Sequence, residues 1–61
     1  MPNSAEAYNN FGVALASQGR LDEAIDQFQR ALALAPGFPD ARRNLSDALQ
    51  QRQDRAKRGG R

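Results

Sequence analysis

The side chains that carry most enzyme chemistry are absent from this sequence. Its 61 residues include no cysteine and no histidine. The chain therefore lacks the usual thiolate nucleophile, the usual general base near neutral pH and two of the common metal ligands. We expect that it is not an enzyme and that it uses no cofactor.

Four carboxylates lie close enough in sequence to raise the question of a metal site: Asp22, Glu23, Asp26 and Asp40. The first three fall at the start and on the solvent face of a predicted helix. Negative charge in a first helical turn complements the helix dipole. This role explains the carboxylates better than metal binding does, so we predict no metal ligand.

Basic residues are concentrated at the C-terminal end. Positions 52 to 61 have a net charge of +4, which leaves −2 for the rest of a chain whose total is +2; the basic residues are Arg52, Arg55, Lys57, Arg58 and Arg61. Such a segment can attract phosphates and so bind nucleic acid weakly. No aromatic residue lies among them to stack on bases. We favour a solvated charge run that keeps the last helix soluble.

The length and composition of the chain limit the secondary structure that can position its charged side chains. Of the hydrophobic residues, 11 are alanine and only 11 are Val, Ile, Leu or Phe. A chain this short makes one small domain, and its scarcity of β-branched residues favours helices. No stretch is apolar enough for a membrane span or a signal peptide. These absences agree with a cytoplasmic location.

Apolar spacing and helix-end residues predict three helices, at about 5–18, 21–35 and 39–56. Ser4 is a suitable N-cap, and Gly19 can take the left-handed conformation that ends a helix. Pro36 and Gly37 end the second helix. After Gln51 no large apolar residue occurs, so we expect residues 57–61 to be a disordered basic tail.

The third helix repeats the first. A shift of 34 residues aligns Ala7 with Ala41, Asn10 with Asn44, Phe11 with Leu45, Ala14 with Ala48 and Leu15 with Leu49, and puts Ser46 at the place of Gly12. The same shift puts Pro2 at the place of Pro36, so the chain begins where a preceding repeat would end. A piece of a longer array, a natural minimal protein and a designed unit all fit this observation.

These residues resemble the tetratricopeptide repeat family. The pattern is Tyr8-x-x-Phe11-Gly12-x-x-Leu15, then Ala24-x-x-x-Phe28, Ala31 and Pro36. Tyrosine in place of the usual tryptophan and leucine in place of the second tyrosine are departures. The resemblance covers residues 5–38 as a full repeat and 39–51 as the first helix of another. It implies an all-α hairpin followed by a capping helix, a fragment of an α-solenoid.

The resemblance also implies a function and a surface. The family forms protein or peptide interaction modules, with a groove lined by the first helix of each repeat. Here the groove residues would be Asn9, Asn10, Val13, Arg43, Asn44 and Asp47, together with Glu6, Ser17 and Gln51. We expect side-chain amides at Asn10 and Asn44 to bind an extended peptide backbone, or else to cap or bridge neighbouring helices.

A second binding mode of the family, a clamp for a C-terminal carboxylate, is not expected. It requires several basic residues in the groove, and only Arg43 with Asn44 meets part of this requirement. Glu6 and Asp40 are acidic where basic residues would be needed.

Assembly is the last expectation. About three repeats are needed for independent stability, and this chain has one and a half. We expect part of the third helix to be uncovered, on the face formed by Ala41, Leu45, Ala48 and Leu49. The chain is therefore expected to self-associate through this face, or by exchanging a helix between copies, with a closed dimer favoured. A purely structural or self-assembling unit is accordingly the alternative function.

Overall fold

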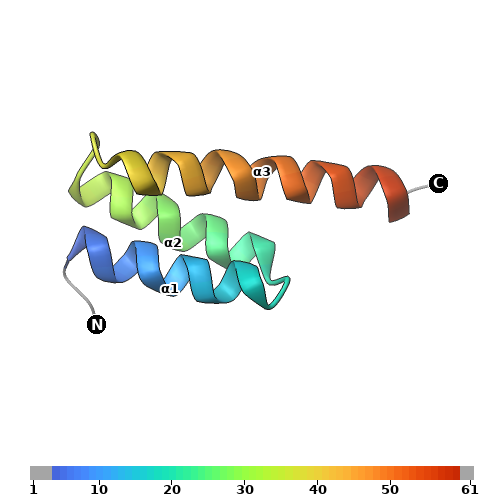
Figure 1. Cartoon of the computed structure of the whole chain (residues 1–61), viewed down its shortest axis with the longest axis horizontal. Helices are drawn as coiled ribbons and strands as arrows, with labels where there is room; N and C mark the ends of the chain where they lie inside the picture. Colours follow the sequence, from blue (N-terminus) through green and yellow to red (C-terminus); the bar gives the residue numbers. More distant parts are fainter. Residues whose placement is uncertain (1–3, 60–61) are drawn as a thin grey trace.

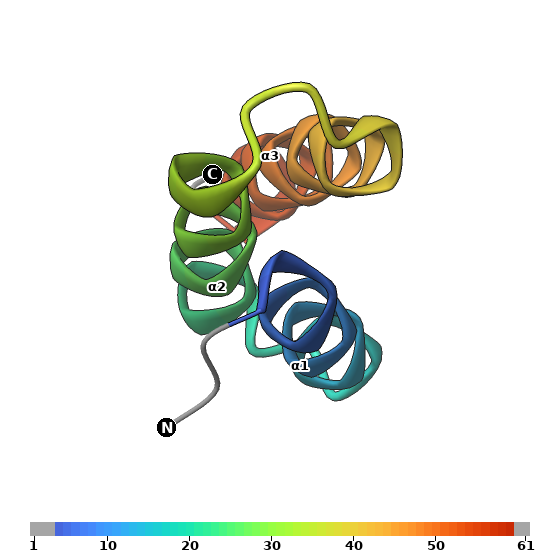
Figure 2. The same cartoon turned by 90° about the vertical axis from the view of Figure 1, so that its left-hand side faces the viewer.

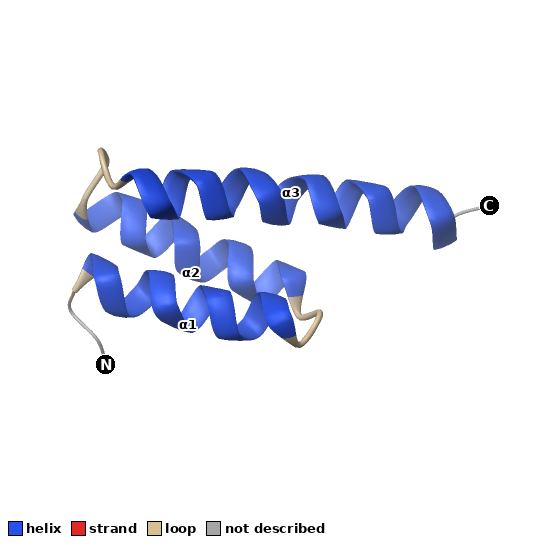
Figure 3. Cartoon of the chain, viewed as in Figure 1, coloured by secondary structure: helices blue, strands red, loops and turns tan. Residues whose placement is uncertain are grey.

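The computed structural model describes residues 4–59, which form three α-helices (Figures 1 and 3). They are α1 (Ala5–Ser17), α2 (Leu21–Leu34) and α3 (Pro39–Gly59), and the described part of the chain has no strand. The all-α prediction is confirmed. No helix within residues 4–59 is both long and apolar enough to cross a lipid bilayer.

Helix α1 is capped at both ends by its own sequence. The Ser4 hydroxyl accepts a hydrogen bond from the Ala7 N–H at 3.0 Å. At the other end, Gly19 has φ +79°. The N–H groups of Gly19 and Arg20 donate to Ala16 and Leu15 carbonyls, both at 3.0 Å, which is a Schellman motif. The chain reverses within three residues, so α2 lies antiparallel to α1.

The turn from α2 to α3 is set by prolines. Ala35 has left the helical region, with φ −138° and ψ 84°, as expected for a residue that precedes proline. Its N–H still donates to Ala31 O at 2.9 Å. Pro39 is the first residue of α3, a position where its missing N–H costs nothing.

The core lies where the three helices meet. Five buried residues form it: Leu15 from α1, Ala24, Ile25 and Phe28 from α2, and Ala48 from α3. Figure 2 shows α1 and α3 on the same side of α2, and each pair of helices is in contact. The second helix is thus the shared support for the other two.

Helices α1 and α2 approach each other closely at Gly12. A Cβ atom at this position would lie 2.5 Å from Cε1 and 2.7 Å from Cδ1 of Phe28, whose side chain is fully buried. Gly12 and the fully buried Ala24 are both small, and the Phe28 ring fills the space beside Gly12. Phe28 is the neighbour that requires the glycine.

Helix α3 differs from its predicted end. It was expected to stop at residue 56, but Lys57, Arg58 and Gly59 belong to it. Its last turns continue past the end of the α1–α2 hairpin (Figure 1). The basic residues Lys57 and Arg58 in the last turn complement the negative end of the helix dipole, which favours continuation of the helix through them. Positions 2, 60 and 61 lie outside the described residues. The expectations that Pro2 takes the place of Pro36 and that residues 60 and 61 belong to a disordered tail fall on these positions.

Substituting Gly12 with alanine should destabilise the fold. The new methyl group overlaps the Phe28 ring, and overpacking of this kind costs about 1–3 kcal/mol. Alanine has a higher helix propensity than glycine, and this offsets the cost by at most about 1 kcal/mol. We expect a net loss of about 1–2 kcal/mol, or a fall of several degrees in Tm, in thermal unfolding followed by circular dichroism.

Gly37→Ala is the matched control. No atom described lies within 4 Å of a Cβ built there. Stability should be unchanged or rise by up to about 1 kcal/mol. Equal stabilities for the two variants would contradict the close approach of Phe28 to the α1 backbone.

Candidate functional site

Helices α1 and α3 are joined by a hydrogen bond between two asparagines. Nδ2 of Asn44 donates to Oδ1 of Asn9 at 2.9 Å. Asn9 is 6% exposed and is the one buried polar residue within the described part of the chain, while Asn44 is half-buried. Buried polar atoms require such partners, because an unpaired one loses its bonds to water without compensation. The pair therefore fixes the position of α3 beside α1.

The neighbouring side chains of the predicted groove remain open to solvent. Asn10 and Val13 on α1 are exposed, as are Arg43 and Asp47 on α3. Val13 is one turn from Asn9, and Asp47 is about one turn from Asn44. The exposed residues therefore flank the buried asparagine pair. Glu6, Ser17 and Gln51 are also exposed, and the Ser17 hydroxyl donates to Ala14 O at 2.8 Å.

Two predicted groove residues therefore have a structural contact. Asn9 is too buried to present its amide to a ligand, and one N–H of Asn44 is already used. The sequence contained a signal for this role that its analysis did not use. Asn9 falls on a stripe of small residues with Ala5, Gly12 and Ala16, all buried or half-buried. A polar residue on such a stripe must find its partner inside the protein.

The face of α3 predicted for self-association is mostly covered by the chain itself. Ala41 is 0% and Ala48 2% exposed, and Leu45 is half-buried against the core. Leu49 alone of the four is exposed, at 39%. Ala41, Leu45 and Ala48 therefore pack within the chain itself, and Leu49 is the part of this face left open; self-association through it stays a prediction.

Two residues of the basic segment contact the α1–α2 turn. Nη1 of Arg52 lies 2.9 Å from Oδ1 of Asp22, and Nη1 of Arg55 donates to Gly19 O at 2.9 Å. These contacts span 30 and 36 residues of sequence, so no local pattern reveals them. They line one side of a shallow pocket of about 270 Å³ beside the turn. Both arginines remain exposed to solvent while they make these contacts, and the solvated charge run stays a prediction.

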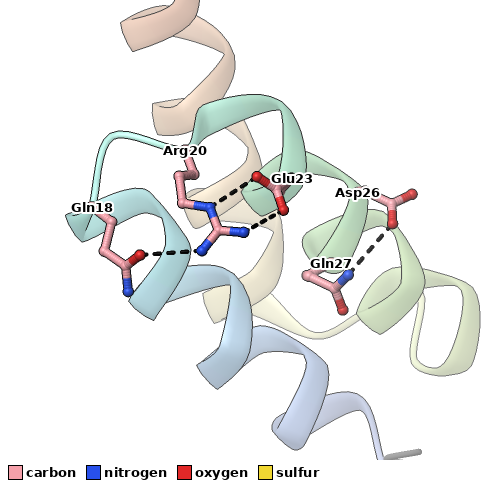
Figure 4. Close-up of polar contacts among 5 residues, drawn as sticks. All are labelled: Gln18, Arg20, Glu23, Asp26 and Gln27. Atoms are coloured by element: carbon pink, nitrogen blue, oxygen red, sulfur yellow. Dashed lines mark hydrogen bonds and ion pairs between the residues drawn. The ribbon is translucent and has the colours of Figure 1, made fainter.

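The carboxylates of α2 are engaged by arginines. Arg20 makes two hydrogen bonds to Glu23, at 2.9 and 2.7 Å, and Gln27 donates to Asp26 at 3.4 Å (Figure 4). The hydrogen bond from Arg20 lowers the pKa of Glu23 below its usual value. Arg30 pairs with Asp26 at 2.9 Å.

The same region contains one polar atom without a partner. Oε1 of Gln27 is buried and has no hydrogen-bond partner among the described residues. Within residues 4–59, no three Asp or Glu side chains are grouped so that they could hold a metal ion.

A family model for the tetratricopeptide repeat matches residues 5–38. The chain belongs to the tetratricopeptide repeat family. Proteins of this family are generally interaction modules, and the fold is generally non-catalytic. The family predicted from the motif, and the helical hairpin followed by a third helix, are confirmed.

Larger proteins contain a segment similar to this chain. A chloroplast tetratricopeptide repeat domain-containing protein of Arabidopsis thaliana is 38% identical over 50 residues, which is 82% of this chain and 17% of that protein. Peroxisomal targeting signal receptors of Kluyveromyces lactis and Saccharomyces cerevisiae are each 44% identical over 45 residues, 74% of this chain. The matched segment spans only 8% and 7% of the two receptors. No solved structure gives a significant match.

The Asn9–Asn44 pair predicts an asymmetric response to alanine substitution. Asn44→Ala leaves Oδ1 of Asn9 buried without a donor, which should lower the free energy of unfolding by about 1–3 kcal/mol. Asn9→Ala should cost less, because the half-buried amide of Asn44 can turn to water. In chemical denaturation, the double variant should lose less stability than the two single losses added together.

Asn10→Ala serves as the control for this cycle, since Asn10 is an exposed amide on the same helix. Its stability should stay within about 0.5 kcal/mol of the parent. Additive losses at positions 9 and 44 would show that their side chains do not interact.

Proposed function

We propose that the chain binds an extended peptide segment of a protein partner across the surface formed by α1 and α3. The observation that carries the proposal is the Asn44–Asn9 hydrogen bond. It holds the two helices side by side, so that exposed residues of both belong to one surface. The contact residues are Asn10, Val13, Arg43 and Asp47, together with the free hydrogen-bonding groups of Asn44.

The chemistry of this surface favours recognition of the peptide backbone. An exposed amide such as that of Asn10 offers two donors and an acceptor, which suit a peptide bond whatever side chains the peptide carries. Arg43 and Asp47 have opposite charges, so the surface does not select a strongly charged ligand. The relatives named as receptors for a targeting signal support a role in recognising protein segments. The proposed module is non-catalytic, and the cytoplasmic location predicted from the sequence is part of the proposal.

Binding should be weak and should depend on Asn10. The surface is short, so we expect a Kd of about micromolar or weaker for ten-residue peptides. An array of such peptides, each with a free and an amidated C-terminus, would identify binders. Their affinities would then be measured by fluorescence anisotropy. Asn10→Ala should weaken binding about fivefold or more, and amidation should have little effect.

Gln29→Ala is the matched control, because Gln29 is an exposed amide on α2. It should bind peptides as the parent does. Equal affinities for the parent and Asn10→Ala would exclude this surface. A large loss on amidation would instead indicate a carboxylate clamp.

A self-assembling structural unit is the second candidate, and the exposure of apolar side chains on two different helices favours it. Phe11 on α1 is 51% exposed, and Leu49 lies open on α3. Both belong to the apolar helical pattern of the sequence, and neither is a contact residue of the proposed peptide-binding surface. Binding of nucleic acid through the basic segment has less support, because Arg52 and Arg55 are engaged at the α1–α2 turn.

A further inference from the structure

A groove with an apolar floor and an acidic wall lies between α1 and α2, apart from the peptide surface. Its volume is about 350 Å³, and the apolar part is formed by Phe11 and the buried Leu15. Asp22, Glu23 and Asp26 line the other side. An aromatic ring beside three carboxylates is suited to an occupant that is both apolar and basic.

The internal repeat shows that Phe11 occupies a packing position. Its counterpart 34 residues later is Leu45, which is half-buried against the core cluster. Phe11 itself is half exposed, and the described residues leave this side of it open. The same position is thus covered in one copy of the repeat and uncovered in the other.

The acidic wall is available to a new partner. The side chains of Asp22, Glu23 and Asp26 are 82%, 56% and 53% exposed, and each has an arginine partner in its own chain. Exposed ion pairs of this kind contribute little to stability, so their carboxylates can exchange one cation for another at small cost. A basic amphipathic helix therefore matches the groove in both apolar and charged contacts.

Helix α3 of the chain itself is such a helix. It exposes Leu49, and Arg52, Ala56 and Lys57 follow at intervals of three, seven and eight residues, on the same side of the helix. Its last turns project beyond the hairpin (Figure 1). The segment from Leu49 to Lys57 thus combines an apolar residue with positive charge. Arg52 and Arg55 already contact Asp22 and Gly19 O of their own chain, so Leu49 and Lys57 are the side chains it offers to another molecule.

We propose that the groove binds α3 of a second copy, with Leu49 against Phe11 and Lys57 against the acidic wall. This inference rests on the self-assembling candidate function and is independent of peptide binding. The groove and the helix that fills it are different surfaces, so two copies either make this contact twice, as a closed dimer, or once each, as links of a head-to-tail chain.

Sedimentation equilibrium of the full chain from about 10 μM to about 1 mM tests the proposal. The parent should associate as its concentration rises. Phe11→Gln, which alters the groove, and Leu49→Gln, which alters the helix, should each raise the dissociation constant about tenfold or more. Both residues are exposed, so helix content in circular dichroism should be retained.

A mixture of the two variants is the decisive sample. Phe11→Gln keeps an intact helix and Leu49→Gln keeps an intact groove, so the mixture should form a 1:1 complex that does not grow further. Leu34→Gln is the matched control, because Leu34 is 54% exposed at the end of α2 and lies outside the groove. It should associate as the parent does.

Charge provides a second test that leaves the apolar residues unchanged. Lys57→Glu should weaken association severalfold, and so should raising the salt concentration. A monomeric parent at all concentrations would overturn the proposal. So would association that survives Phe11→Gln, as helix exchange predicts, or a variant mixture that fails to form the complex, as expected if two α3 helices pack on each other.

Discussion

The fold depends on the absence of a side chain at position 12. The Phe28 ring occupies the space that a Cβ atom on Gly12 would need, so α1 can lie close against α2 only because this residue is glycine. That approach brings Leu15 into the same cluster as Ala24 and Ile25. The cluster in turn provides the surface that receives α3. In a chain with 11 large apolar residues, a single close contact of this kind determines whether the others can form.

A polar contact then sets the position of the third helix. Alanines 41 and 48 allow α3 to approach α2, but side chains this small specify its rotation and register weakly. The hydrogen bond between Asn44 and Asn9 adds a directional constraint. Arg55, bonded to Gly19 O, adds another at the far end of the helix. Both are single bonds with defined donors and acceptors, and they align α3 with α1 along its length.

The sequence was sufficient to predict whatever depends on neighbouring residues. Ser4, Gly19 and Pro39 mark helix ends through local backbone preferences, and the 34-residue repeat identified the hairpin. The partner of Asn9 and the contacts of the basic segment were missed because they join residues 30 to 36 positions apart. The groove residues stay a prediction, and which of them are buried depends on how α3 is rotated, which periodicity does not determine.

The two copies of the first helix show how the same pattern leads to different surfaces. On α1, Gly12 and Leu15 pack against α2, whereas their counterparts on α3, Ser46 and Leu49, are exposed. The change from glycine to serine makes that face of α3 compatible with water, because a hydroxyl can bond to solvent and close packing is no longer needed. Phe11 has no comparable polar replacement. It is apolar and half exposed, whereas its counterpart Leu45 packs against the core. Among the described residues, the exposed large apolar side chains are Phe11 and Val13 on α1, Leu34 on α2 and Leu49 on α3. Helix α1 therefore carries two of them, whereas the rest of the exposed face of α3 is mostly polar and basic.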